Sequence, residues 1–275
     1  MSPLRTFALK IALTTRLTLT ALVLASLLFA QVNTEALRRE ELAPGLHTTL
    51  GADLGLIAGN SDLLRLKSNL RFDYLGGGNH FFLVTQYQQG SKDEQVFINK
   101  GFAHLRSVRA LRRRLHAEGF LQREFNEFIS LEDRQLAGGG LRIRWQQRGG
   151  SAETPPPLQL NTGIGLMWER ERIDTTGNAP GDPVHGAVAS LVRSTNYLVL
   201  RWRLDERLTL FSTTYYQVDL RRFSDYRLLW EGRLGVTLTK RLSLTLNLDL
   251  RYDSEPPGGI KPCDLEITNG VSYRL

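Results

Sequence analysis

Positively charged residues occupy alternate positions in several stretches of the chain, among them Arg65 with Lys67 and Arg142 with Arg144. Alternate side chains of a β-strand share one face, so this spacing gathers cations on one side of a sheet. Around a pore, such a surface would favour anions. Acidic residues occupy the same face, and ion pairs between acidic and basic side chains would instead fill the enclosed interior and make it rigid. Both interpretations apply to the predicted interior residues Arg65, Lys67, Arg71, Arg142, Arg144, Arg201, Arg203, Arg227, Glu231, Arg233, Asp249 and Arg251.

The remaining reactive residues form no recognisable catalytic or metal-binding motif. A lipase or deacylase at a barrel rim needs a serine, a histidine and a polar residue that orients the histidine. No serine stands beside any of the five histidines in such an arrangement. One cysteine and scattered histidines give no metal-ligand spacing, and the glycines at 138–140 lack the strand-to-helix context of a phosphate-binding loop. We therefore expect no catalytic residue, no metal and no cofactor.

Hydrophobic residues fill the positions between the polar ones, which predicts β-strands. In LSLTLNLDLRYD (242–253), leucines alternate with polar residues, and residues 64–74 repeat the pattern. Turn-forming sequences such as LGGGN (75–79) and SEPPGGIKP (254–262) separate the alternating stretches. The stretch 110–125 also fits an amphipathic helix. The predicted strands lie at about 46–57, 62–74, 80–89, 95–106, 110–125, 131–147, 158–172, 188–204, 207–221, 225–239, 241–253 and 263–275.

Antiparallel strands with one apolar face fit either a soluble sandwich or a membrane barrel. Strand length favours the barrel, because a tilted strand needs ~9–11 residues to cross a bilayer, whereas soluble strands average about 5–6. In a membrane barrel, every second connection should be short. In the later half of the chain, tight turns at 205–207 and 239–240 alternate with long connections at 173–187 and 254–262, but the connection at 148–157 does not fit this alternation. The predicted fold class is all-β, a transmembrane antiparallel up-and-down β-barrel of about 12 strands.

Tryptophan and tyrosine near the predicted strand ends give a further argument for a membrane. Each has an apolar ring and a polar tip, which suits the boundary between lipid and water. With strands that alternate in direction, the predicted aromatic girdle has a periplasmic belt of Tyr74, Trp145, Trp202 and Tyr273 and an outer belt of Trp168, Tyr226 and Tyr252. In a closed barrel the last strand would also pair with the first, so that no edge remains.

The first thirty residues are predicted to be a secretory signal peptide. They carry Arg5, Lys10 and Arg16 without an acid, and the apolar run LTLTALVLASLLFA is short for a membrane-spanning helix of ~20 apolar residues. A retained helical anchor is the alternative. Without these three cations the formal net charge falls from +7 to +4, so the basic composition does not by itself indicate nucleic acid. The predicted division is a signal peptide at 1–30, a short periplasmic segment at 31–45 and an outer-membrane barrel at 46–275.

Two stretches resemble a known family. One is RYDSEPPGGIKPCDLEITNGVSYRL (251–275), with a YDS-x-PP-x-G-x-K turn and an NG-x-SY ending, and the other is GFLQREFNEFISLEDRQLAGGGLRIRW (119–145). Both resemble the bacterial salt-induced outer-membrane protein family, a domain of unknown function, over residues 46–275. The resemblance implies an outer-membrane barrel in a Gram-negative organism and brings no established catalytic or binding residues.

We therefore expect a monomeric, non-enzymatic protein of the cell outer membrane. Its expected role is envelope structure or passive passage of small solutes, with a link to salt or osmotic conditions implied by the family. The expected partners are outer-membrane lipid and the barrel assembly machinery, which reads a C-terminal strand, and not nucleic acid. The alternative function is a rim-active enzyme that modifies lipids, a lipase or deacylase.

Overall fold

The computed structural model describes residues 34–35, 37–39, 42–57, 62–93, 95–145, 157–176, 187–239, 241–256, 258 and 260–273. The predicted signal peptide lies outside these ranges, as does most of the connection 148–157. The described chain contains twelve strands and one short 3-10 helix, η1 (Glu127–Ile129). The strands are β1 (Gly45–Ile57), β2 (Leu63–Gly76), β3 (Asn79–Lys92), β4 (Gln95–Ala110), β5 (Leu115–Asn126), β6 (Leu131–Trp145), β7 (Leu158–Ile173), β8 (Val188–Arg203), β9 (Leu208–Asp219), β10 (Tyr226–Thr237), β11 (Leu242–Asp253) and β12 (Cys263–Tyr273).

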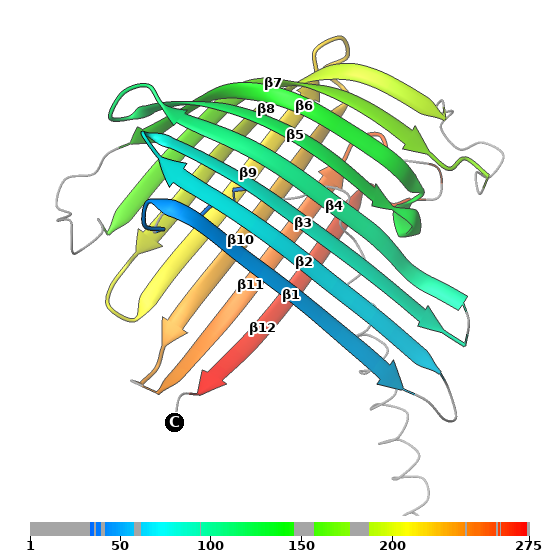
Figure 1. Cartoon of the computed structure of the whole chain (residues 1–275), viewed down its shortest axis with the longest axis horizontal. Coiled ribbons are helices and arrows are strands. Elements are labelled where there is room, and N and C mark those ends of the chain that lie inside the picture. Colours follow the sequence, from blue (N-terminus) through cyan, green and yellow to red (C-terminus); the bar gives the residue numbers. More distant parts are fainter. Residues whose placement is uncertain are drawn as a thin grey trace, which may run out of the picture.

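Each strand pairs antiparallel with its neighbours in sequence, so the sheet order runs from β1 to β12 without a crossover. The sheet curls around an interior (Figure 1). Its strands are 11 to 16 residues long, which is long enough to cross a bilayer at a tilt. The predicted fold class, an all-β up-and-down barrel, is confirmed.

Charged side chains face the interior and apolar side chains face outward. Arg142, Glu169 and Arg193 are at most 2 % exposed, whereas Leu50 and Leu54 are 76 % and 73 % exposed. A soluble protein has the opposite arrangement, with leucine inside and charge outside. The alternation of the sequence therefore produces a wall with an apolar outer face and a polar inner face, as transmembrane barrels require.

The predicted pairing of the last strand with the first is not observed. Among the described residues, no ladder joins β12 to β1, and these strands are the two edges of the sheet. Their inward positions carry small or acidic residues, such as Gly51, Gly55 and Glu266.

The segment with an ambiguous prediction forms strands, so the alternative helix at 110–125 is wrong. β4 continues to Ala110, residues 111–114 form a turn, and β5 begins at Leu115. The backbone N–H of Leu111 donates to the carbonyl of Leu115, so these two leucines flank a turn. Their spacing resembled a helical repeat only because the turn separates them by four positions.

Glycine permits two tight features of the wall. Gly77 and Gly78 have φ values of +58° and +77° and form the two-residue turn between β2 and β3, a conformation that side chains disfavour. In β6, a Cβ atom at Gly140 would lie 2.3 Å from the carbonyl oxygen of Ile164 in β7. Glycine at 140 therefore permits close packing of β6 against β7.

Candidate functional site: the charged barrel interior

Three of the described residues that precede β1 lie inside the barrel. Thr34, Glu35 and Arg38 are each at most 5 % exposed. The carboxylate of Glu35 accepts hydrogen bonds from Arg38 at 3.0 Å and from Arg106 of β4 at 2.7 Å, and it also pairs with Arg142 of β6. One carboxylate therefore joins the N-terminal segment to two strands of the wall.

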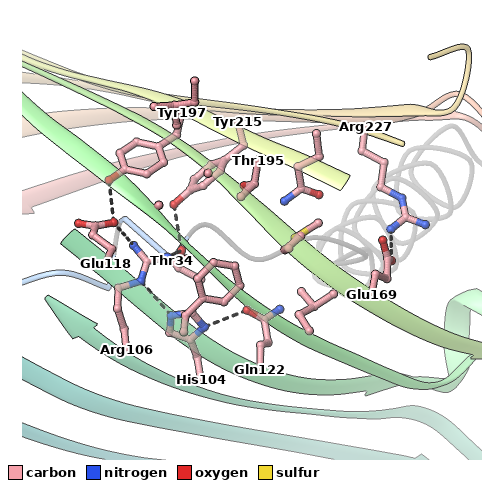
Figure 2. Close-up of a pocket in the computed structure, with 18 of the residues that line it drawn as sticks. Thr34, His104, Arg106, Glu118, Gln122, Glu169, Thr195, Tyr197, Tyr215 and Arg227 are labelled. Carbon is pink, nitrogen blue, oxygen red and sulfur yellow. Dashed lines mark hydrogen bonds and ion pairs between the residues drawn. The ribbon is translucent and has the colours of Figure 1, made fainter. Parts of the chain in front are cut away.

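A second carboxylate, that of Glu118 in β5, extends this contact to the opposite wall. It accepts hydrogen bonds from Arg38 at 2.6 Å and from the hydroxyl of Tyr197 in β8 at 2.9 Å. The hydroxyls of Thr34 and Tyr215 lie 2.9 Å apart. Figure 2 shows the two tyrosines reaching across the interior toward Glu118 and Thr34. We call this group the Glu35 cluster: Thr34, Glu35, Arg38, Arg106, Glu118, Arg142, Tyr197 and Tyr215.

The charges of the Glu35 cluster hold its N-terminal members in their ionised forms. Burial by itself would raise the pKa of Glu35, but the positive charges of Arg38, Arg142 and Arg106 together hold that pKa well below its ordinary value. Burial by itself would lower the pKa of Arg38, but the negative charges of Glu35 and Glu118 outweigh this effect and hold that pKa above its ordinary value. Removing one member of such a buried set leaves an uncompensated charge, which is strongly unfavourable.

A second ion cluster lies in the same interior and centres on Glu169 of β7. Its carboxylate pairs with Arg227 at 2.5 Å, with Arg193 at 2.7 Å and with Arg134 at 3.2 Å. These arginines also contact other acids, for example Arg134 with Glu124 at 2.8 Å. We call this group the Glu169 cluster: Glu124, Arg134, Glu169, Glu171, Arg193, Asp225, Arg227 and Asp253.

Two side chains connect the clusters. The Nε of Arg106 donates to His104 Nε2 at 3.3 Å, and His104 Nδ1 lies 3.0 Å from the side-chain amide oxygen, Oε1, of Gln122. Gln122 in turn donates to Glu124 of the second cluster at 3.0 Å. The cavity between them has a volume of only about 50 Å³. A continuous polar network therefore fills the interior along β4–β8.

The interior is more open elsewhere. A cavity of about 640 Å³ lies against β1–β5, with the N-terminal segment, β10 and β11 completing its wall. A second cavity, of about 480 Å³, lies against the inner faces of β8–β12. Both are large enough for a small solute, since ligand sites usually measure 300–1,000 Å³.

The structure divides the residues that were predicted to line the interior. Arg142 and Arg227 belong to the two ion clusters. Arg71 pairs with Asp73 at 2.6 Å, and Arg251 lies 3.5 Å from Glu231.

The predicted interior residues outside the two ion clusters lie around the two cavities or close to strand ends. The larger cavity is lined by Lys67, Arg71, Glu231 and Arg251 of the predicted set, and the smaller by Arg201, Glu231, Arg233 and Asp249. Arg65 and Arg144 are half-buried, and Arg203 is exposed at the end of β8. The predicted set therefore does not converge on one site.

Several members of the clusters were missed from the sequence. Arg134 and Arg193 occupy the same alternate positions as the predicted arginines of β6 and β8. Extending the alternation along the full length of these two strands would therefore have identified them. Arg106 lies in β4, where the alternation is weak. Glu35 precedes every strand and belongs to no periodic pattern, so no sequence signal marks it.

The predicted aromatic girdle lies mostly at the strand ends. Tyr74, Trp145, Trp202 and Tyr273 are within three residues of the ends of β2, β6, β8 and β12 and are all at least 42 % exposed. Tyr226 and Tyr252 lie at the other end of the wall, with ring centroids 5.5 Å apart. Trp168 lies further inside β7, where its indole donates to Ser190 at 3.0 Å.

The described histidines do not form a serine-based catalytic group. His80 lies 3.0 Å from Asp73, and His104 is stacked between Phe102 and Phe120. Neither they nor His47 and His116 bond to a serine within the described chain. His185 lies outside the described residues. No helix in the described part of the chain is long and apolar enough to span a membrane.

The apolar outer wall, the aromatic strand ends and the charged interior together define the class of this protein as a transmembrane β-barrel with a partly filled lumen. The chain belongs to the family described as "Protein of unknown function, DUF481", whose model matches residues 49–275. This is the salt-induced outer-membrane protein family that the two sequence motifs indicated. No curated protein matches the chain in sequence.

Solved structures with a similar overall arrangement are bacterial membrane barrels. The NanC porin is 11 % identical, with a TM-score of 0.43 over 83 % of this chain and 99 % of the porin. The transport unit of the autotransporter AIDA-I from Escherichia coli is 13 % identical, with a TM-score of 0.40 over 93 % of this chain and 97 % of that unit. The translocator domain of NalP from Neisseria meningitidis is 14 % identical, with a TM-score of 0.39 over 84 % and 87 % of the two chains.

Proposed function

We propose that this protein is an integral β-barrel of the cell outer membrane that serves envelope structure and passive passage of small solutes, without enzymatic activity. The division of the interior carries the proposal. Two buried ion clusters close one part of the lumen, while cavities of about 640 and 480 Å³ leave room for water and small solutes. A fully filled barrel would be a scaffold alone, and an empty one would be a wide pore.

Conductance across a planar bilayer tests the proposed passage. Purified wild-type protein should give small, discrete conductance steps, because only the unfilled part of the lumen is available to ions. The Glu35→Gln variant should give larger steps, since it weakens the attachment of the N-terminal segment to the wall. The absence of steps from both proteins would leave the scaffold role and exclude passage.

The family and the apolar outer wall support the proposed outer-membrane location. This location places a requirement on the two edge strands, β1 and β12. Lipid cannot hydrogen-bond an unpaired strand edge, so the two edges should meet once the barrel is in a bilayer. In a Cys263→Ser background, Leu50→Cys should form a disulfide with a cysteine at one of three outward positions of β12, Leu265, Ile267 or Val271. Failure of every pair to cross-link in membranes, while a pair across β1 and β2 does cross-link, would contradict closure.

The other parts of the proposal concern processing and partners. We propose cleavage of a signal peptide at 1–30, a periplasmic segment at 31–45, insertion by the barrel assembly machinery as a monomer, and contact with outer-membrane lipid but not with nucleic acid. A link to salt conditions is supported by the family alone. Membrane fractionation and N-terminal sequencing of the mature protein test the location and the cleavage.

The alternative function, a rim-active lipid-modifying enzyme, draws on one observation. Asp73 and His80 form a pair at the end of β2 and the start of β3, with His80 Nε2 3.0 Å from the carboxylate. Such a pair orients a catalytic histidine in hydrolases. Incubation with labelled phospholipid and lipid A should show no product from wild type. A product that disappears in His80→Ala would favour the enzyme.

A further inference from the structure

The larger cavity has the size and the walls of a small-molecule site. Its volume is about 640 Å³, within the range of ligand pockets. β1–β5 form one side, Leu37 and Arg39 of the N-terminal segment form another, and Glu231 and Arg251 approach from β10 and β11. Glu35, two residues before Leu37, attaches this N-terminal segment to β4 and β6 through Arg106 and Arg142.

Two lysines lie in one row across its floor. The register places Lys67 of β2 opposite Gln88 of β3, and Gln88 opposite Lys100 of β4. Neighbouring strands are about 4.8 Å apart, so the two lysine backbones are separated by roughly 10 Å. Flexible side chains at this separation can approach the same anionic group or the two ends of one small molecule.

Positive charge is in excess around this row. Lys100 interacts with the like charges of Lys67 and Arg251, and Glu266 of β12 acts on it in the opposite direction. Arg39 adds another positive charge and donates to Thr49 at 3.3 Å. Like charges that share a partly enclosed space repel each other, and an anion bound among them would relieve this repulsion.

The acids of the cavity wall compensate only part of this charge. Glu124 pairs with Arg134 of the Glu169 cluster at 2.8 Å. Glu231 lies 3.5 Å from Arg251. Asp53 of β1 stands opposite Lys67 in the register. Of the wall acids, Asp53 is therefore the one placed to compete with an anion for Lys67.

Amides and aromatic rings complete the wall. Asn69, Gln86, Gln88 and Asn126 offer donors and acceptors for hydroxyl groups, and Phe102 and Phe125 offer apolar contact. We propose that this cavity is a binding site for a small organic anion that carries a carboxylate or phosphate and hydroxyl groups, with Lys67 and Lys100 as its principal cationic contacts. This inference rests on the proposed function, because the solute must reach the lumen.

Binding to the folded barrel in detergent tests the proposal with matched probes. Gluconate and glucose share a carbon skeleton and differ in charge, so calorimetric titration should detect gluconate and not glucose. Glucose 6-phosphate, titrated in parallel, separates a preference for phosphate from one for carboxylate. The double variant Lys67→Gln/Lys100→Gln should weaken gluconate binding about tenfold or more, since hydrogen bonds to charged groups each contribute strongly.

Two further variants keep the test decisive. Arg233→Gln removes a cation from the smaller cavity and should change gluconate affinity less than twofold. Asp53→Asn removes the acid opposite Lys67 and should tighten binding, an effect in the opposite direction that loss of folding cannot imitate. Equal binding of glucose and gluconate, or an unchanged affinity in a folded double variant, would overturn the proposal. Protein that migrates as a heat-modifiable barrel from the outer-membrane fraction and binds no anion would overturn this inference while leaving the proposed function intact.

Discussion

The region of β4–β8 and the region formed by β1–β3 with β11 and β12 share the same alternation of residues, but their inward charges have different surroundings. In β7, the carboxylate of Glu169 has three arginine partners on β6, β8 and β10 and is 1 % exposed. In β11, Asp249 faces Glu266 of β12 in the register and lines an open cavity. Inward charge is therefore structural at Glu169, where arginines from three strands surround it, and borders open space at Asp249.

The largest effect is expected at Glu35. Glu35→Gln leaves Arg38, Arg106 and Arg142 without their shared carboxylate, so the free energy of unfolding should fall by about 3–5 kcal/mol. Urea unfolding in micelles, followed by tryptophan fluorescence, measures it. The control is Glu132→Gln, which breaks an exposed pair with Arg172 and should cost less than about 1 kcal/mol.

The same variant has a defined pH dependence. Folding lowers the pKa of Glu35 from an ordinary value of 4.5. The contribution of Glu35 to the free energy of unfolding is therefore complete well above pH 4.5 and is lost progressively as the pH falls below that value. The stability difference between wild type and Glu35→Gln should therefore be constant from pH 6 to 8, within roughly 0.5 kcal/mol, and shrink in acid. A difference that grows on acidification would mean that Glu35 is protonated in the folded protein.

A slightly smaller effect should distinguish the two regions directly. Glu169→Gln removes a carboxylate shared by three arginines and should lower the free energy of unfolding by about 3 kcal/mol. Asp249→Asn, the equivalent change beside an open cavity, should alter it by less than about 0.5 kcal/mol. Equal effects in the same unfolding assay would mean that the two regions do not differ in how they use charge.

Packing of the wall provides a third comparison. Gly140→Ala places a methyl group 2.3 Å from the carbonyl oxygen of Ile164 and should destabilise the barrel by about 1–3 kcal/mol. At Gly270 in β12, nothing lies within 4 Å of the added atom, so Gly270→Ala should be close to neutral. Thermal unfolding, followed by the shift in gel migration, compares the two. A larger loss of thermal stability in Gly270→Ala than in Gly140→Ala would indicate that the edge strand β12 packs closely against another part of the protein when the barrel is in a membrane.

The smallest effect on the free energy of unfolding is expected from added salt. Raising NaCl from 0.1 to 1 M shortens the screening length from about 10 to about 3 Å but hardly reaches buried pairs. The free energy of unfolding should therefore change by less than about 0.5 kcal/mol, while gluconate binding among Lys67 and Lys100 should weaken several-fold. A large loss of stability in 1 M salt would show that the ion clusters are open to solvent.

The prediction from sequence succeeded where the pattern was local and periodic. In β11, regular alternation from Leu242 to Tyr252 placed the strand and both of its faces correctly. In β4 and β5, glycine, alanine and histidine weaken the alternation, so the turn at 111–114 was placed too early. Period-two patterning reports which face a side chain occupies and carries no information on which residues meet across an interior.

The sequence by itself therefore determined the lipid-facing leucines and part of the inward set of arginines, because the face that a strand residue occupies follows from the alternation around it. It also predicted the up-and-down order of the strands, which is confirmed. Only the tertiary structure decided that Glu35, outside every strand, lies among Arg38 of its own segment and the arginines of two strands, Arg106 of β4 and Arg142 of β6. It also decided that Lys67 and Lys100 share an open cavity while Arg142 and Arg227 are buried in ion pairs. The physical reason is that ion pairs such as Arg142 with Glu35 and Arg227 with Glu169 join residues far apart in the chain, which only the folding of the sheet brings together.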